Sequence, residues 1–444
     1  MTEGKLSKLA GQLLAKAKYK AEAADVNGGT GWSSRVEFTE NRLKQIKSRQ
    51  SAILALRVII NGRLGVAATN QMETDELSMV VGEAVEVAKE GKKAEFSLPG
   101  KAKTIQPSTY DRQVERLTEK ELVARGEESI EIIRRAEPDL RVNSLSWAKG
   151  VRLAVFLNSE GVEMGNKESS TSFGLEVSRI KEGDFFQLWT GQTSIRDDIN
   201  WRGMIENLLA KVKWGKRIVK AAAGSQTVVF APEAAEAVIN YFLTAANGKI
   251  VNEGMSKFAG KLGKKLFDGS LTIVDDPTVA WGVESYALDD EGVPGCRKLL
   301  VNRGEVTSFY YDLAQGSKAG VASTGNGSRS PFSQAQPQTA NVFVSGGEES
   351  FAQLLAGVKQ GLVVYQLLGV GQNNPYNGDF QFGVNLGYWV ENGQTVGRVK
   401  DVGIAGNVFD LFRDRLIGVS EETERWGELT APYVFLDGVT VSAK

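Results

Sequence analysis

The sequence contains no histidine and a single cysteine, Cys296. These two residue types supply most zinc ligands, and histidine is the usual base that activates a serine or cysteine nucleophile. A conventional zinc-protease site and a histidine-dependent triad are therefore excluded for this chain. One cysteine cannot form an intrachain disulfide, which is compatible with a reducing compartment. We interpret Cys296 as a small packing residue, with a slightly activated thiol beside Arg297 as the alternative.

Long apolar runs and a dominant charge are also absent. No window approaches the run of about 20 apolar residues that a membrane helix needs, and lysines interrupt the short apolar stretches near the N-terminus. The net charge of -1 gives no overall field that would attract nucleic acid or an anionic membrane. We therefore expect a cytoplasmic protein with no nucleic-acid or membrane partner. One basic run is interpreted as the solvent face and C-terminal end of a helix rather than as a basic patch: Lys211, Lys213, Lys216, Arg217 and Lys220.

The 444 residues are enough for two or three domains. Hydrophobic periodicity predicts helices over 5–24, from about 74, and over 119–135, 201–213 and 232–246. It predicts strands over 51–60, 151–157, 173–180, 185–189 and 227–230. Helices and strands come in blocks rather than in βαβ alternation, which predicts a multi-domain α+β protein with antiparallel or mixed sheets. The expected domains are 1–95, 114–218 and a β-rich 222–444, with a polar linker at 95–113.

Turn residues mark where the predicted elements end. Asn27-Gly28-Gly29 is expected to stop the first helix. Hairpin turns are predicted at Asn61-Gly62, 302–304, 391–393 and Asp437-Gly438, because asparagine and glycine adopt positive φ readily. Residues 323–340 form a long segment rich in Gly, Ser, Gln and Pro. A loop of this length is usually functional or disordered, and both alternatives stay open.

No other catalytic constellation stands out. The acidic pairs at 197–198, 275–276 and 289–290 lack the alternating ligands of a calcium loop, so we interpret them as turn or strand-end residues. A Ser-Lys dyad remains formally open, but no motif singles out one pair. The residues alone therefore predict neither a catalytic residue nor a metal ligand.

The C-terminal third unit resembles the TldD/PmbA (TldD/TldE) family. The motifs that carry the resemblance are Asp-Glu-Gly-Val-Pro at 290–294, the hairpin at 298–306, Tyr-Asp-Leu at 311–313, Gly-Val-Ala-Ser-Thr-Gly-Asn-Gly at 320–327, Trp-Val-Glu-Asn-Gly at 389–393 and Ile-Ala-Gly-Asn at 404–407. They are specific in combination, and the resemblance is strong from about 224 to 442. It is weaker, though colinear, over the first two units.

The resemblance implies two kinds of subunit. In the TldD kind, a helix carries His-Glu-x-x-x-His and a distant cysteine completes a zinc site, whereas the PmbA (TldE) kind lacks these ligands. Colinearity places Asn240 and Tyr241 at the His-Glu positions and Ala245 at the second histidine. None of the three replaces the family ligand or base, and we expect Asn240 and Tyr241 to serve helix packing. The chain thus looks like a non-catalytic PmbA-type subunit, with no cofactor of its own and zinc only in a TldD-like partner.

The resemblance also implies that the partner complex degrades or processes unfolded or small peptides, and that the subunit can form a homodimer when alone. A self-contained homodimeric peptide-binding protein without protease activity is the alternative. The loop 323–340, with Arg329, Phe332 and Gln334, is predicted to line a peptide channel. Aromatic residues near Tyr365, Tyr376, Tyr388 and Trp389 could line it too, although aromatics at strand spacing are more often core. Deleting 328–338 is expected to lower peptide turnover without unfolding the protein.

Overall fold

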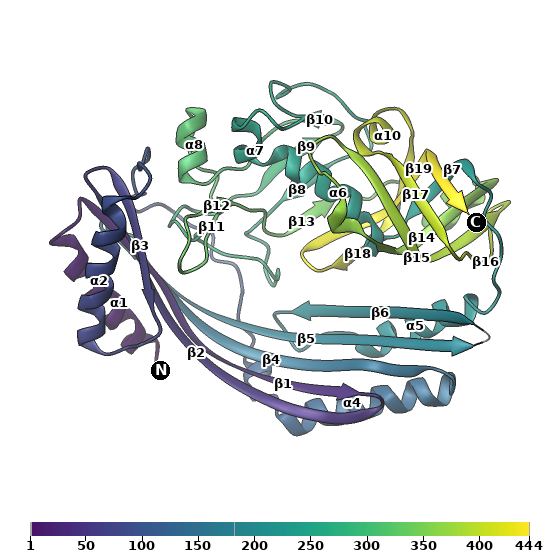
Figure 1. The fold of residues 1–444 in the computed structure, drawn as a ribbon, viewed down its shortest axis with the longest axis horizontal. Coiled ribbons are helices and arrows are strands. Elements are labelled where there is room, and N and C mark those ends of the chain that lie inside the picture. The colour runs from purple at the N-terminus through teal and green to yellow at the C-terminus, as the bar shows by residue number, and fades with distance from the viewer. Residues whose placement is uncertain (1, 182, 444) are drawn as a thin grey trace.

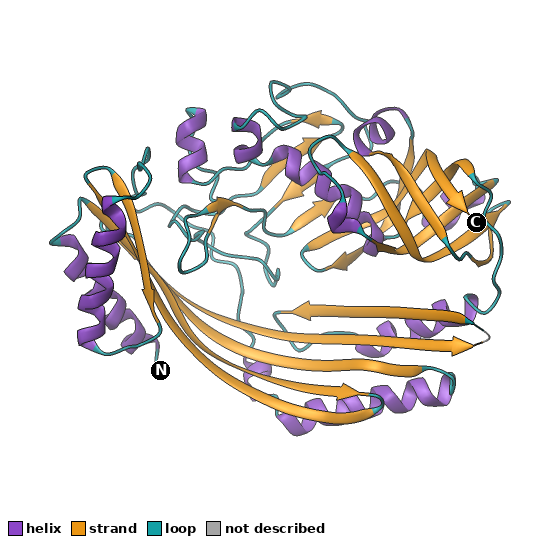
Figure 2. Cartoon of the chain, viewed as in Figure 1, coloured by secondary structure: helices purple, strands orange, loops and turns teal. Residues whose placement is uncertain are grey.

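The computed structural model describes residues 2–181 and 183–443. It confirms the α+β class: a six-stranded sheet is formed by residues 23–194, and an eleven-stranded sheet by residues 224–443. The first sheet is long and strongly curved, and the C-terminal domain sits over its concave side (Figure 1). Figure 2 shows helices mainly on the outside of this curve and around the second sheet.

The six-stranded sheet has the order β3-β2-β1-β4-β5-β6, and all its neighbours are antiparallel. Its strands are β1 Ala23–Thr39, β2 Arg42–Ile60, β3 Arg63–Thr69, β4 Arg141–Asn158, β5 Glu163–Lys181 and β6 Asp184–Ser194. Because β1 pairs with β4, the predicted domains 1–95 and 114–218 contribute to one continuous sheet. The segment between them has no regular element before α3.

The first helix, α1 (Glu3–Lys18), ends earlier than the sequence predicts, and Asn27, Gly28 and Gly29 lie inside β1. The prediction was wrong because these glycines allow close strand packing instead of stopping a helix. A Cβ added to Gly28 would lie 2.6 Å from the side chain of Leu54 on β2. The inner position of β1, between β2 and β4, requires this small residue.

All the longer N-terminal helices cover the convex face of the sheet. Val26 and Val36 of β1 point to the same face, since strand side chains alternate. Val26 packs with α1 and α2 (Thr74–Lys89), and Val36 with α4 (Glu119–Ala136) and α5 (Trp201–Trp214). A short helix, α3 (Arg112–Arg116), precedes α4. The concave face carries the alternate residues of β1, such as Asn27, Gly29, Gly31 and Ser33, and is polar.

The second sheet is mixed. Strand β7 pairs in parallel with β14, and β13 in parallel with β19, whereas its other ladders are antiparallel. Its strands are β7 Gly224–Phe230, β8 Ile273–Asp275, β9 Lys298–Asn302, β10 Glu305–Val306, β13 Val342–Val344, β14 Gln360–Leu368, β15 Asp379–Glu391, β16 Gln394–Arg398, β17 Val402–Asn407, β18 Leu416–Trp426 and β19 Leu429–Ala443. Its helices are α6 Pro232–Ala246, α7 Gly248–Asn252, α8 Leu313–Ala319, α9 Phe351–Ala356, α10 Val408–Asp414 and the 3-10 turn η1 Val370–Gln372.

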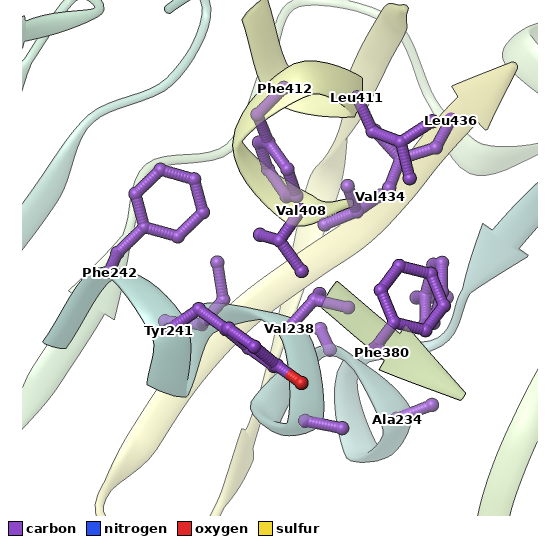
Figure 3. Packing of buried hydrophobic residues seen from close by; sticks show 14 of the residues in the cluster. Ala234, Val238, Tyr241, Phe242, Phe380, Val408, Leu411, Phe412, Val434 and Leu436 are labelled. Atoms are coloured by element: carbon purple, nitrogen blue, oxygen red, sulfur yellow. The ribbon is translucent and has the colours of Figure 1, made fainter. Parts of the chain in front are cut away.

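Helix α6 is the most deeply buried helix of the C-terminal domain. Tyr241 and Phe242 project from it into a core that includes Val408 and Phe412 of α10 (Figure 3). The ring of Phe242 has edge contacts to Phe412 at 4.9 Å and to Phe267 at 5.0 Å between centroids. The predicted strand 227–230 and helix 232–246 are confirmed here, because Pro232 occupies the first turn and an apolar face follows.

Turn predictions were right where the turn closes a hairpin. Asn61-Gly62, Arg303-Gly304 and Asn392-Gly393 all have positive φ and join antiparallel strands. The predicted turn at Asp437-Gly438 was wrong. It lies inside β19, where the pairing with β7 shifts between Leu436 and Val439, so the glycine forms a bulge rather than a hairpin.

The C-terminal domain covers the β6 edge of the first sheet. Three side chains of the C-terminal domain donate hydrogen bonds to backbone carbonyl oxygens of this outer strand. Asn385 donates to Gln187 at 3.0 Å, Gln366 to Trp189 at 2.6 Å, and Arg425 to Thr193. These bonds satisfy backbone groups that an edge strand leaves open.

Within the described residues, no helix combines the length and apolar character that crossing a membrane requires.

Truncating Phe242 should destabilise the C-terminal domain. The change Phe242→Ala removes a fully buried ring that contacts four other phenylalanines, and we expect a loss of about 3–5 kcal/mol in the free energy of unfolding. Urea denaturation followed by circular dichroism measures it. The exposed Leu262 provides the control: Leu262→Ala should change the midpoint little, and equal effects of the two variants would contradict this packing.

Candidate functional site

A cavity of about 530 Å³ lies between the concave face of the first sheet and loops of the C-terminal domain. Its sheet wall comes from the middle of β1, β4 and β5, including Gly31, Gly150 and Ser170. The opposite wall comes from residues 283–290, 326–328 and 338–340. The cavity is therefore built at the junction of the two sheets, and its wall includes two segments that carry the family-like motifs.

The turn 289–292 forms the acidic wall of this cavity. Asp289 is buried, and its carboxylate accepts hydrogen bonds from the backbone N–H groups of Glu291, Val293 and Gly327 at 2.8–2.9 Å. Burial, together with the negative charge of Glu291, raises the pKa of Asp289 to about 8 despite these bonds. Asp290 accepts from Asn27 Nδ2 of β1 at 2.9 Å. The turn is thus fixed both to its own domain and to the sheet.

A buried ion network joins the two parts of the protein below the cavity. Arg57 donates from Nε to Asp25 Oδ2 at 2.7 Å and from Nη1 to Glu291 Oε1 at 2.5 Å, and its Nη2 lies 2.6 Å from Asp25 Oδ2 as an ion-pair contact. Arg329 Nη2 donates to the other oxygen of Asp25 at 2.5 Å. All four side chains are at most 4 % exposed. Burial alone would lower the pKa of Arg57, but Asp25 and Glu291 raise it above its usual value.

Glu291 also contacts helix α8, and a separate buried carboxylate, Asp275, lies at the end of strand β8. Glu291 Oε2 accepts from the backbone N–H of Leu313 at 2.7 Å, at the start of α8. Asp275, at the end of β8, accepts from Asn326 Nδ2 at 2.9 Å and from the N–H of Ala340 at 2.7 Å. The acidic pairs 275–276 and 289–290 are therefore strand-end and turn residues, as the sequence predicts.

The loop 323–340 contains a short ribbon of β11 (Gly327–Ser328) and β12 (Gln336–Pro337) at its base. Its three predicted channel residues differ in exposure. Arg329 turns inward to Asp25. The buried carboxylates of Asp25 and Glu291 need more positive charge than Arg57 alone supplies. Phe332 is 69 % exposed at the tip, and Gln334 is half-buried. Phe332 and Gln334 thus keep the exposure that a peptide contact needs, whereas Arg329 is structural.

Helix α6 carries the three residues that the resemblance places at the zinc-motif positions, Asn240, Tyr241 and Ala245, in different environments. Asn240 is exposed, whereas Tyr241 and Ala245 are buried. The Tyr241 hydroxyl donates to the carbonyl oxygen of Asp379 at 3.0 Å, and Ala245 has no ligand atom. Burial raises the pKa of Tyr241, which keeps its hydroxyl neutral. These residues do not fit a zinc ion, because they offer neither imidazole nor carboxylate at one point.

A second, smaller cavity of about 120 Å³ lies where α5, β6 and α6 meet. Lys211 Nζ and Glu233 Oε1 form an ion pair there at 2.6 Å, and burial raises the pKa of Glu233. Lys211 thus points inward to a carboxylate, and Lys216 pairs with Glu137. The other four members of the predicted basic run are exposed at and beyond the C-terminal end of α5, as expected, so only Lys211 departs from the prediction.

The structure also tests the sequence interpretations of Cys296 and of two aromatic residues, Tyr388 and Trp389. Cys296 is exposed, so the packing interpretation was wrong: its Sγ lies 3.6 Å from the carbonyl oxygen of Thr324 at the surface. Tyr388 and Trp389 are core residues, with 1–2 % exposure. They cannot contact a peptide without unfolding, and the strand-core alternative is the correct one.

Sequence reasoning missed Asp25, Arg57 and Glu291 as a unit. One signal was present: Arg57 interrupts the otherwise apolar stretch Ile53–Ile60, and an arginine in a buried strand needs a carboxylate partner. The identity of that partner was not accessible, because Glu291 lies more than 200 residues away along the chain. Only the fold brings them together.

Removing Arg57 should strongly destabilise the protein. The change Arg57→Met keeps the volume but leaves Asp25 and Glu291 as buried carboxylates with too few cations, at a cost of about 3–5 kcal/mol. The matched control is Arg135→Met, which breaks the exposed helical pair with Glu131 and should change stability by about 0.5 kcal/mol or less. Thermal and urea unfolding compare them, and similar losses in both variants would show that the network does not hold the domains.

Asp289 should make stability fall as pH rises. Its folded pKa of about 8 exceeds the ordinary value, so the stabilising contribution is complete below about pH 4 and is lost progressively up to about pH 8. We expect the urea midpoint of the wild type to fall over this window relative to that of Asp289→Asn, which cannot ionise. A constant difference between the two from pH 5 to pH 8 would mean that Asp289 is already ionised.

Comparison with known proteins gives consistent matches over nearly the whole chain. A metalloprotease from Methanothermobacter thermautotrophicus is 26 % identical, with 91 % of this chain and 89 % of that protein covered. Metalloprotease PmbA from Escherichia coli O157:H7 is 24 % identical, with 97 % and 94 % covered. The crystal structure of TldE from Thermococcus kodakarensis superposes with a TM-score of 0.90 at 22 % identity, covering 98 % of this chain and 100 % of that chain.

A Thermotoga maritima protein named as a modulator of a DNA gyrase has the same fold, with a TM-score of 0.88, 21 % identity and coverage of 98 % and 99 %. The model of the PmbA/TldA metallopeptidase C-terminal domain matches residues 223–443, and that of the PmbA/TldA metallopeptidase domain 1 matches residues 24–88. These matches contain the buried network and most of the cavity's C-terminal wall. The chain therefore belongs to the PmbA/TldD metallopeptidase family.

Proposed function

We propose that this chain is a non-catalytic, PmbA/TldE-like subunit of a cytoplasmic TldD/TldE-type metalloprotease complex that degrades or processes unfolded or small peptides. In this proposal the chain holds no cofactor, and zinc is bound by a TldD-like partner. The partner performs the hydrolysis, while this chain helps to receive the peptide. Relatives named metalloprotease, PmbA and TldE support the general activity class.

The observation that carries the proposal is that α6 has no zinc-binding side chain at positions 240, 241 and 245. Asn240 points to the surface, while Tyr241 and Ala245 are buried in the core. Zinc peptidases need ligands that converge on one ion and a base for the attacking water. No side chain at these three positions supplies either function, and the sequence offers no histidine elsewhere.

The cavity and the concave face support a role in peptide binding. Glycine and serine residues on β1, β4 and β5, such as Gly31, Gly150 and Ser170, leave the sheet face largely polar and shallow at the cavity wall, with Phe156 and Met164 among its larger apolar residues. A surface without large apolar pockets contacts a peptide backbone with little preference for its side chains. The exposed Phe332 could then contact the peptide from the loop above. Such a surface suits varied, unfolded substrates.

The primary test reconstitutes the complex. We would measure bound zinc by elemental analysis and cleavage of an unfolded peptide by this chain, by a TldD-like subunit from the same genome, and by both together. We expect no stoichiometric zinc and no cleavage by the chain alone, and faster cleavage by the pair than by the partner. Stoichiometric zinc or cleavage by this chain alone would overturn the proposal.

Phe332→Ser tests the loop within that assay. Losing an exposed aromatic contact worth about 1 kcal/mol should raise KM by roughly fivefold to tenfold with kcat nearly unchanged. Leu262→Ser, at another exposed site, is the matched control. This change is preferable to deleting 328–338, because that deletion also removes Arg329 and its ion pair with Asp25. An unchanged KM would exclude Phe332 as a peptide contact.

A self-contained homodimeric peptide-binding protein is the second candidate. The same cavity and polar face favour it, since they do not depend on a partner. The reconstitution assay separates the two functions. A stable homodimer that binds peptide but leaves the turnover of the TldD-like subunit unchanged would favour this alternative.

A further inference from the structure

The β2 strand has a long unpaired edge. It runs from Arg42 to Ile60, but its neighbour β3 pairs only with Leu54–Ile60. Within the described residues, 42–53 therefore pair with β1 on one side and with no strand on the other. At roughly 3.3 Å per residue, this open edge is about 40 Å long. It is the lowest strand of the curved sheet in Figure 1, on the side away from the C-terminal domain.

The two edges of the sheet differ in how they are covered. The C-terminal domain donates side-chain hydrogen bonds to carbonyl oxygens of β6, whereas residues 42–50 of β2 are exposed apart from the half-buried Gln45. An open edge offers unpaired backbone N–H and C=O groups to any extended chain. Among the residues described, the β2 edge thus offers a long exposed stretch that is free to accept another strand.

Side chains of the open edge alternate in character. Ile46 pairs with Val36, so it points to the helix-covered face, and it is 47 % exposed. Lys47 and Arg49 pair with Arg35 and Ser33, and point to the concave face. The segment 42–53 contains four basic residues and no acidic residue. An added strand would therefore meet Arg49 and Lys47 on one face and an apolar side chain on the other. Lys47 Nζ also lies 3.8 Å from Glu37 Oε2 of β1, but its side chain is 63 % exposed and can turn to a second carboxylate.

A second copy of the same edge does not fit. An antiparallel pairing of the basic part, residues 42–49, with itself places Arg42 opposite Arg49 and Lys44 opposite Lys47, and any antiparallel self-pairing brings two sets of four cations together. Like charges directly opposite each other destabilise a strand pair. The β6 edge of a second copy does not fit either, because its one acid, Asp184, is already paired with Arg398. The complementary occupant is a different, acidic chain.

We propose that residues 42–53 bind an extended segment of another polypeptide by strand addition, and that this segment alternates acidic and β-branched apolar residues. Backbone hydrogen bonds fix the added strand, its carboxylates lie against Lys47 and Arg49, and its apolar residues lie against Ile46. This docking surface is separate from the peptide cavity and does not depend on the proposed function. Its lysines would otherwise act only as guards against edge pairing, as lysines often do.

The test uses a dodecapeptide of alternating Glu and Val, with two controls: the same peptide N-methylated at every residue, so that neither edge can donate, and a Lys-Val version. Hydrogen exchange of 42–53 in the full-length protein and fluorescence anisotropy of the labelled peptide are the readouts. We expect the acidic peptide to bind and to slow exchange of 42–53, and neither control peptide to do so. Lys47→Glu with Arg49→Glu should weaken binding about tenfold, whereas the exposed Lys213→Glu in α5 should not.

Each other outcome overturns the proposal. No binding, or binding without slower exchange of 42–53, would mean that the basic residues only guard the edge. Equal binding of the N-methylated peptide would show attraction by charge without strand pairing. Equal protection by a single-stranded oligonucleotide would identify a phosphate-binding surface instead. The peptide controls use the wild-type protein, so the test stands even if the charge-reversal variant fails to fold.

Discussion

The buried network of Arg57, Asp25, Glu291 and Arg329 is the interaction on which the arrangement of the two sheets depends. Its members come from β1, from β2 and from two loops of the C-terminal domain. Two cations and two carboxylates neutralise each other in a region that water does not reach. Such a network is costly to break, although it contributes less to net stability than its short distances suggest. Its main effect is to fix the position of the turn 289–292 against the sheet, which in turn defines the cavity.

The position of the cavity follows from this arrangement. The turn 289–292 can form a wall only because Glu291 is held by Arg57 and Asp290 by Asn27. The loop 323–340 is placed by the same network through Arg329, while its tip remains free to carry Phe332 at the surface. One set of buried charges therefore sets both the back of the cavity and the root of the loop above it. Changes that disturb the network would alter the cavity even where no cavity residue is substituted.

The elements with strong local signals could be predicted from the sequence. Helices α2, α4, α5 and α6 followed from apolar periodicity, and three hairpins from Asn-Gly or Arg-Gly turns. The central strand β1 could not be predicted, because its glycines indicate a loop until β2 and β4 lie beside it. At the candidate site, the degenerate residues of α6 were found by resemblance. The ion network was not, since its partners are distant in sequence and only burial makes their pairing necessary.

The pairing of β1 with β4 also constrains how the chain reaches its fold. Asp25 lies opposite Asn158, so β1 lacks one neighbour until more than 150 residues have left the ribosome. The network that locks the sheets needs Glu291 and Arg329, which are made later still. Contacts so distant in sequence slow folding and leave strand edges exposed during synthesis. The nascent N-terminal half therefore carries unpaired strand edges until those later residues have been made.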